Sequence, residues 1–323
     1  MITIGIPAYN VEKYITRCLL SVENQTYNNI EVIIVEDCST DSTLLEVENF
    51  LKTQNHTKTY KLIKNLNNKG LAFNRNRIIE ESKGEYIFFL DSDDEIPMNS
   101  IELLFNKINN SKYDFVCGGI QYIANNDSYN EFFQNYSSQY QNYAFANFFI
   151  NNKFKYHNEV WNKLYRKSFL LNNDLKFIDV KSHEDSIFTF QVMVNCKSFG
   201  MIAEPVYKYY QYSKSMSHDI NSKQYIDFIK IKNEFKRLLA TDLYKKCPLA
   251  YDIYISQMAF FSRFMDSKNL PKELRKGYIV DYQGLIRIKK FTRKLIYLNL
   301  MIYDSYKIFK IFNAIYHLKS KIR

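Results

Sequence analysis

The sequence predicts an α/β fold: a mixed, mainly parallel sheet with helices on both faces, followed by a helical C-terminal region. Short apolar runs rich in β-branched residues alternate with longer stretches whose apolar residues recur at helical spacing. The apolar runs are continuous, which is typical of parallel strands buried on both faces. The length of 323 residues, 46% of them hydrophobic, allows one large core with an appendage.

The first third of the chain is expected to alternate strand and helix. Strands are predicted at 2–6, 30–36, 60–65 and 85–90, and helices at 11–25, 42–54 and 70–82. Asp41 with Ser42 provides an N-cap for the second helix. In such sheets ligands bind beyond the carboxyl ends of the strands. The candidate site residues lie at those ends, namely Pro7 to Asn10, Glu36 with Asp37, and Asp91 to Asp94.

The middle of the chain has a different composition. After "YDFVCGGIQYI" at 113–123, residues 124–158 are rich in Asn, Gln, Tyr and Phe. This stretch is interpreted either as an excursion that covers an open site or as a mobile surface segment. Ordered structure is expected again at 159–173, with a helix at 183–195 and a strand at 205–212. Beyond about residue 221 the chain is helix-like and aromatic.

Charge and cysteine content limit the function classes. The net charge is +10, but residues 268–323 alone carry 14 Lys and Arg against 3 Asp and Glu, which leaves the remainder at −1. A neutral body argues against a nucleic-acid-binding protein, whose basic residues would be spread over the body. The five cysteines are scattered, which argues against disulfides or a zinc site and indicates a reducing compartment. Because "MITIGIPAYN" has no secretory signal pattern, a cytoplasmic protein is expected.

A cluster of acids follows the fourth predicted strand. In "GEYIFFLDSDDEIP" the apolar run Ile87–Leu90 leads directly into Asp91, Asp93, Asp94 and Glu95. Carboxylates this close repel one another, and the repulsion raises their pKa unless a cation or hydrogen-bond donors offset it. The cluster is therefore either a solvated turn or a place for a cation.

Six stretches in order make the chain resemble family 2 glycosyltransferases of the GT-A fold, a Rossmann-like nucleotide-binding architecture, over roughly residues 1–218. Each lies at a predicted strand end or helix start. They are "IPAYNVEKYI" with "CLLSVENQTY" (6–27), "VIIVEDCSTDST" (32–43), "NKGLAFNRN" (68–76), "YIFFLDSDDEI" (86–96), "WNKLYRKSFL" (161–170) and "HEDSIF" (183–188). The resemblance implies a GT-A domain at 1–220, with a donor-binding half at 1–120 and an acceptor-binding half at 121–220, and a helical, basic region at 221–323.

The resemblance also implies a nucleotide-sugar donor, most simply a UDP-sugar, and a Mn²⁺ or Mg²⁺ ion that offsets the charge of the departing diphosphate. Asp93 would be the direct metal ligand, and Asp91 would lie by the ribose or the metal's water shell, with Ser92 beside them. Asp37 would accept a hydrogen bond from uracil. Other residues implied in donor binding are Pro7, Ala8, Tyr9, Glu36, Gly70 and Arg75. Cys38 stands where the family has a turn glycine.

The chemistry of the transfer is implied for the "HEDS" stretch. Asp185 would act as general base for the acceptor hydroxyl, with Glu184 orienting donor or acceptor, although acids at a helix start are also favoured by the helix dipole alone. Trp161 would pack against the acceptor sugar or else belong to the core. His218 would be an additional metal ligand or a structural histidine.

The expected function is an inverting, metal-dependent transfer of a sugar to a saccharide or lipid-linked saccharide acceptor in bacterial surface glycan synthesis. The alternatives are a sugar-phosphate nucleotidyltransferase, which would need a Gly-rich basic loop where this chain has "PAYN", and a nucleic-acid-binding protein acting through its basic tail. The tail at 285–323 mixes basic and apolar residues at near-helical spacing. It is interpreted either as a peripheral contact with the inner face of the cell membrane or as a helix packed on the body or on a second subunit.

Overall fold

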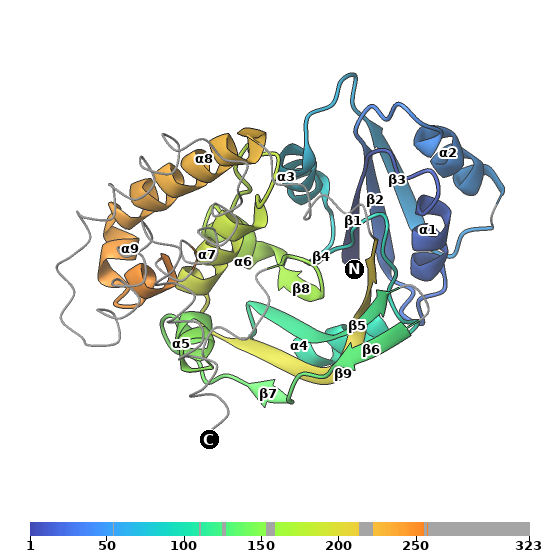
Figure 1. The fold of residues 1–323 in the computed structure, drawn as a ribbon. Coiled ribbons are helices and arrows are strands. Elements are labelled where there is room, and N and C mark those ends of the chain that lie inside the picture. The colour runs from blue at the N-terminus through green and yellow to red at the C-terminus, as the bar shows by residue number, and fades with distance from the viewer. Residues whose placement is uncertain are drawn as a thin grey trace. The chain divides into compact units, whose positions relative to one another are not determined.

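The structure is a computed structural model that describes residues 1–53, 55–109, 111–124, 127–152, 159–212, 222–254 and 257. The chain divides into two compact units, Met1–Asp219 and Ile220–Arg323. Each unit is described by itself (Figure 1).

A nine-stranded mixed sheet organises the described part of the first unit. Its order is β3-β2-β1-β4-β8-β5-β9-β7, with β6 paired to β5. The strands are β1 (Ile2–Ala8), β2 (Ile30–Glu36), β3 (Thr59–Lys64), β4 (Tyr86–Phe89), β5 (Phe115–Ala124), β6 (Asp127–Glu131), β7 (Tyr136–Ser137), β8 (Lys163–Arg166) and β9 (Phe199–Gln211). The pairs β1–β2, β1–β4, β2–β3 and β5–β9 are parallel. The pairs β4–β8, β5–β6, β5–β8 and β7–β9 are antiparallel. The mixed α/β prediction is confirmed.

The strands at the centre are buried on both faces, as their continuous apolar sequences predict. Every residue of β1 and β2 is buried, because α1 (Ile15–Glu23) and α2 (Thr43–Thr53) cover one face and α3 (Leu71–Glu81) covers the other (Figure 1). The approach of α3 to β1 requires Gly5, since a Cβ there would collide with the Ile78 side chain. The sheet therefore fixes where α3 lies.

Two helix starts show how local polar groups set the boundaries. Asp41 Oδ1 accepts hydrogen bonds from the Thr43 amide at 2.9 Å and the Thr43 hydroxyl at 2.6 Å, in agreement with the predicted cap of α2. The first helix was expected from residue 11 but begins at Ile15. The reason is that the amides of Val11 and Glu12 donate to Thr43 Oγ1 and Asp41 Oδ2 instead of remaining free at a helix start.

The middle of the chain is more regular than its composition indicates. Within 124–158 the described residues form β6, β7 and α5 (Ala144–Asn151), so this stretch is not one irregular excursion. Phe145, Phe148 and Phe149 of α5 are buried, which shows that its aromatic content is largely core. The helices α4 (Ser100–Asn109), α6 (Lys167–Asn172) and α7 (Asp185–Asn195) complete the described part of this unit.

The second unit is described only in its first part. It contains α8 (Ser222–Leu239) and α9 (Asp242–Lys246). Phe228, Ile231 and Phe235 of α8 are buried at helical spacing. The tail at 285–323 and His218 lie outside the described residues. Across the described ranges, no helix combines the length and the apolar character needed to cross a membrane.

Candidate active site

The acidic cluster forms a tight turn at the carboxyl end of β4. The Leu90 amide still donates to the Gly5 carbonyl of β1 at 3.0 Å, and the Asp94 amide then turns back to the Asp91 carbonyl at 3.1 Å. We call residues 91–95 the acidic loop. At the far end of the loop, the backbone amide and carbonyl of Glu95 each form a hydrogen bond with the backbone of Lys208 in β9. The loop is therefore anchored at both ends.

Three of the four acids in this loop have protein partners. Asp91 Oδ1 accepts from Arg75 Nη2 at 2.8 Å. Asp94 accepts from the Tyr207 hydroxyl at 2.9 Å and from the Tyr210 amide at 2.8 Å. Glu95 pairs with Arg17 and accepts from the Tyr210 hydroxyl; the distances are 2.8 and 2.5 Å. These contacts offset part of the repulsion that the sequence predicts.

Asp93 is the exception. Among the described residues, no side chain donates a hydrogen bond to its carboxylate. Burial raises the pKa of Asp93 to about 6, and the neighbouring Asp91 carboxylate adds to the rise. Burial likewise raises the pKa of Asp94, which also lies beside Asp93 and Asp91. The Asp93 carboxylate is thus a partly buried oxygen donor whose charge is only partly offset, by a backbone hydrogen bond and by the nearby Arg17 guanidinium.

A divalent cation fits this donor set. Mg²⁺ and Mn²⁺ prefer hard oxygen ligands and are held by one or two carboxylates together with substrate phosphates. Asp93 supplies one such carboxylate, and Asp91 lies beside it with its side chain 27% exposed. In the described ranges no group of three or more His, Cys, Asp or Glu residues could hold a metal by itself. A cation at this turn would therefore need phosphate oxygens from a ligand.

Arg75 connects the acidic loop to the start of α7. Its guanidinium donates from Nη2 to Asp91 and from Nη1 to Glu184 Oε1, and its side chain is 3% exposed. Burial alone would lower the pKa of Arg75, but the carboxylates of Asp91 and Glu184 outweigh burial and raise it. Its buried Nε atom has no partner among the described residues. Arg75 therefore stays charged and holds two acids from distant parts of the chain together.

Asp185 follows Glu184 and begins α7. Burial raises the pKa of Asp185 well above its ordinary value, and the Glu184 and Glu159 carboxylates add to this effect. A carboxylate with a raised pKa is a better proton acceptor near neutral pH than an ordinary aspartate. Because Arg75 bonds both Glu184 and Asp91, it brings the neighbouring Asp185 carboxylate, with its raised pKa, toward the acidic loop.

The expected base pocket lies at the ends of β1 and β2. The Asp37 carboxylate is buried and accepts three hydrogen bonds: Oδ1 accepts from Asn65 Nδ2 at 2.7 Å and the Lys69 amide at 2.8 Å, and Oδ2 accepts from the Gly70 amide at 2.8 Å. Gly70 adopts φ +86°, a conformation suited to glycine. Asp37 thus shapes the loop that begins α3, and contact with a base stays a prediction.

Glu36 and Cys38 complete this turn. Glu36 accepts hydrogen bonds from the Cys38 and Ser39 amides at 3.3 and 2.7 Å. Cys38 adopts φ +57°, so the loop keeps the left-handed conformation expected of the glycine it replaces. Beside the turn, Pro7 and Ala8 are buried in β1 and Tyr9 is 45% exposed. The three residues are placed together at the predicted end of the sheet.

Trp161 lies among aromatic residues of β9. Its ring stacks on Tyr207 at 4.5 Å and on Tyr209 at 5.4 Å between centroids, and the residue is 6% exposed. Since Tyr207 also donates to Asp94 and accepts from the Asp91 amide at 3.1 Å, the stack adjoins the acidic loop. Ser92 of that loop is buried. Trp161 is therefore largely a core residue next to the site.

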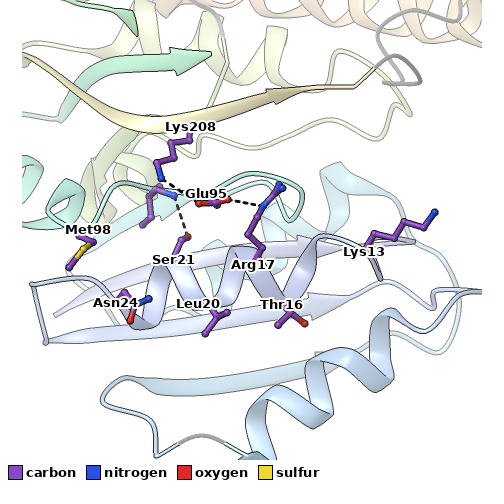
Figure 2. Close-up of a pocket in the computed structure, with 10 residues that line it drawn as sticks. Lys13, Thr16, Arg17, Leu20, Ser21, Asn24, Glu95, Met98 and Lys208 are labelled. Atoms are coloured by element: carbon purple, nitrogen blue, oxygen red, sulfur yellow. Dashed lines mark hydrogen bonds and ion pairs between the residues drawn. The ribbon is translucent and has the colours of Figure 1, made fainter. Parts of the chain in front are cut away.

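A groove of about 510 Å³ runs along α1 and shares only Glu95 with the acidic loop (Figure 2). Its lining includes Arg17 of α1, Lys13 just before that helix, Glu95 and Lys208. Asp91, Asp93 and Asp185 do not line it. Sequence reasoning assigned no role to Arg17, because its hydrogen-bond partners lie 76 and 195 residues away. No local pattern could have identified these contacts.

The comparison with known families decides the identity of this domain. The profile of glycosyl transferase family 2 matches residues 3–172, more than half of the chain. The chain belongs to glycosyl transferase family 2. This membership sets aside the nucleotidyltransferase and nucleic-acid-binding alternatives for the domain.

The relatives of this family 2 glycosyltransferase include bacterial glycosyltransferases. The putative glycosyltransferase EpsH of Bacillus subtilis is 30% identical over 64% of this chain and 60% of its own length. The poly(ribitol-phosphate) β-N-acetylglucosaminyltransferase TarS of Staphylococcus aureus is 28% identical over 63% of this chain and 34% of its own. The matches thus span less than two thirds of these relatives.

Solved structures support the fold. A crystal structure of S. aureus TarS residues 1–349 with UDP superimposes with a TM-score of 0.64 and 23% identity, covering 86% of this chain and 78% of that one. The complex with UDP-GlcNAc gives a TM-score of 0.63 and 21% identity, covering 93% and 90%. The GT-A fold expected from the sequence is confirmed.

Proposed function

We propose that this family 2 glycosyltransferase moves a sugar from a UDP-sugar to a saccharide or lipid-linked saccharide, with inversion at the anomeric carbon and with Mn²⁺ or Mg²⁺ bound. The observation that carries the proposal is the contrast within the acidic loop. Asp91, Asp94 and Glu95 have protein partners, whereas the Asp93 carboxylate has no side-chain donor among the described residues and a pKa raised to about 6.

Asp93, with Asp91, would hold the metal ion. When bound, the ion stabilises the negative charge that develops on the departing diphosphate. Arg75 keeps Asp91 in place through the bond at 2.8 Å. Because Arg75 is already occupied by two carboxylates, its contribution to donor binding is to orient Asp91. His218 remains a candidate additional ligand.

Asp37 would recognise the uracil. Its carboxylate offers about four lone-pair positions, of which the protein uses three. The remaining position on Oδ2 suits the imide N–H of a uracil lying against Pro7, Ala8 and Tyr9. Glu36 and Gly70 maintain the loops around it. The UDP and UDP-GlcNAc present in the TarS structures support a uridine-based donor.

Asp185 would act as the general base. It removes the proton from the acceptor hydroxyl while that oxygen forms its bond to the anomeric carbon, opposite the departing diphosphate. Glu184, held by Arg75, orients this base. Trp161 would form part of the floor of the acceptor site through its stack on Tyr207 and Tyr209.

The acceptor would belong to a surface glycan. The relatives named as poly(ribitol-phosphate) glycosyltransferases support a saccharide or polyol-phosphate polymer as the class of acceptor. Synthesis of such a polymer would place this chain at the cytoplasmic side of the membrane, where the basic tail would make a peripheral contact or join a second subunit.

The test is a panel of nucleotide-sugars with Mn²⁺ and a purified glycan acceptor, with release of nucleoside diphosphate as the readout. Asp93→Asn should lower kcat by about 10³-fold or more, because it removes charge stabilisation of the transition state. Asp127→Asn, at an exposed position of β6, is the matched control and should be unchanged. Activity that survives both chelator and Asp93→Asn would refute the metal assignment.

The pH profile tests the base separately. Asp185 must be deprotonated to accept a proton, so a raised pKa predicts that kcat rises with pH over a range above that of an ordinary aspartate. Asp185→Asn should abolish the activity, and with it the rise of kcat with pH, while UDP binding persists. Substantial transfer by Asp185→Asn would remove it as the base.

A further inference from the structure

We propose that Arg17 is a positioning residue for metal-dependent nucleotide binding, because it fixes the backbone of Asp93 and ties it to the C-terminal end of β9. The inference rests on the proposed function. Arg17 lies on helix α1, whereas the sequence predicts the site at the ends of the strands. Arg17 touches neither nucleotide nor acceptor in this assignment and acts through Asp93.

The Arg17 guanidinium joins three elements of the first unit. Its Nη2 donates to the Asp93 carbonyl at 2.6 Å and to the Tyr212 hydroxyl at 2.9 Å. Its Nε lies 2.8 Å from Glu95 Oε1, and its central carbon lies 3.7 Å from the centroid of the Tyr210 ring. Figure 2 shows the side chain reaching from α1 toward Glu95. The planar guanidinium thus bonds at its edge and stacks on its face.

The Asp93 carbonyl is the point at which the protein can orient this residue. The carboxylate has no side-chain donor within the described residues, so its direction is set by the backbone that carries it. Arg17 and Tyr212 both donate to the Asp93 carbonyl, at 2.6 and 3.4 Å. The remaining loop contacts hold residues on either side, at Asp91 and Asp94. Arg17 is therefore a cation that bonds directly to the backbone of residue 93.

Lys13, in the turn just before α1, differs from Arg17 in this respect. Lys13 lies one helical turn earlier and lines the same groove, with no hydrogen bond or ion pair to the acidic loop recorded among the described residues. A lysine at position 17 would keep the charge but would lack the fork that reaches a carbonyl and a carboxylate together. The inference therefore predicts that both the charge and the shape of Arg17 matter.

The experiment is calorimetric titration of UDP into the full-length protein, once with saturating MnCl₂ and once with EDTA. Arg17→Met should weaken UDP binding in Mn²⁺ about tenfold, as expected for loss of a hydrogen bond to a charged group. Binding in EDTA should be unchanged, since contacts to the base and ribose do not involve residue 93. Lys13→Met is the matched control and should bind as the wild type in both conditions.

Arg17→Lys and Tyr212→Phe provide the same test if Arg17→Met does not fold, and each should give a smaller loss that is confined to Mn²⁺. Equal affinity of the wild type and the Arg17 variants in Mn²⁺ would overturn the inference. A loss of the same size in EDTA would also overturn it, because that pattern indicates a general structural role. A wild type that binds no UDP in Mn²⁺ would overturn the proposed function, and the inference with it.

Discussion

Adjacent acidic residues in one turn have different roles because their partners differ. Asp91 and Asp94 lie in the same loop after β4, yet one pairs with Arg75 of α3 and the other with Tyr207 of β9. Asp93, between them, projects without a side-chain donor among the described residues. The sequence alone identifies the cluster and its repulsion, whereas only the fold distinguishes the acid that is available to a cation.

Asp93 should lower the stability of the metal-free protein. Its pKa is about 6 in the folded state against an ordinary value of 3.8, so between these values the folded state binds more protons than the unfolded state. Stability therefore falls as pH rises through this window, and the full penalty is present above it. Asp93→Asn should raise the free energy of unfolding at pH 7 in EDTA by about 1–3 kcal/mol, with the gain vanishing below about pH 4.

Urea denaturation at several pH values checks this expectation, with Asp127→Asn as the control that should show no gain. Mn²⁺ with UDP should reverse the order of stability, because a ligand that binds only the folded wild type stabilises it by mass action. Equal stabilities of wild type and Asp93→Asn at pH 7 would contradict the origin of the raised pKa. The expected gain in stability of Asp93→Asn would also show that function, and not stability, explains this aspartate.

At the residue level, the sequence identifies candidates where a local pattern marks them. Asp91 and Asp93 were found because they end an apolar strand, and Asp41 because it precedes a helix. Arg17 and Tyr207 were not found, since their contacts join segments far apart in the chain. The roles of Asp37 and Trp161 were also incomplete without the structure, which reveals the three amide donors of one and the stacked tyrosines of the other.

At the scale of elements, the sequence predicts strands and helices well where one residue pattern dominates. The strands β1 to β4 were expected close to their observed positions because each is a continuous apolar run. In the segment 124–158 the Asn, Gln and Tyr content does not reveal β6 and α5, because their partners are supplied by β5 and by buried aromatic residues. Antiparallel pairing of β8 with β4 is likewise set by tertiary structure, because four residues carry little information about direction.

The contact between α3 and β1 should be sensitive to a single methyl group. Gly5→Ala would place a Cβ against Ile78, and since both positions are fully packed the clash should lower the free energy of unfolding by about 1–3 kcal/mol. In an Ile78→Ala background the same substitution should cost little, because the colliding side chain is gone. A double-mutant cycle by urea denaturation measures this coupling. The same cost in both backgrounds would show that Gly5 is required for another reason.

At the scale of the whole molecule, charge is distributed unevenly along the chain. Residues 268–323 hold a net charge of +11 and the rest −1. The family match ends at residue 172, so it gives no account of this basic segment. The sequence leaves two interpretations, a membrane surface or a second protein subunit, and these differ in what they require of the lysines and arginines.

The membrane interpretation predicts a strong dependence on basic residues. Each lysine or arginine near an anionic leaflet contributes about 1 kcal/mol, so replacing Lys289, Lys290, Arg293 and Lys294 by Gln in the full chain should weaken sedimentation with anionic vesicles by two or more orders of magnitude. High salt should have the same effect on the wild type, because these charges are screened. Neutral vesicles provide the control, and UDP binding should be unaffected. If the tail is instead a helix packed on the body with its basic face in water, the wild type should not bind vesicles. If the tail joins a second subunit, the substituted protein should differ from the wild type in sedimentation coefficient without lipid.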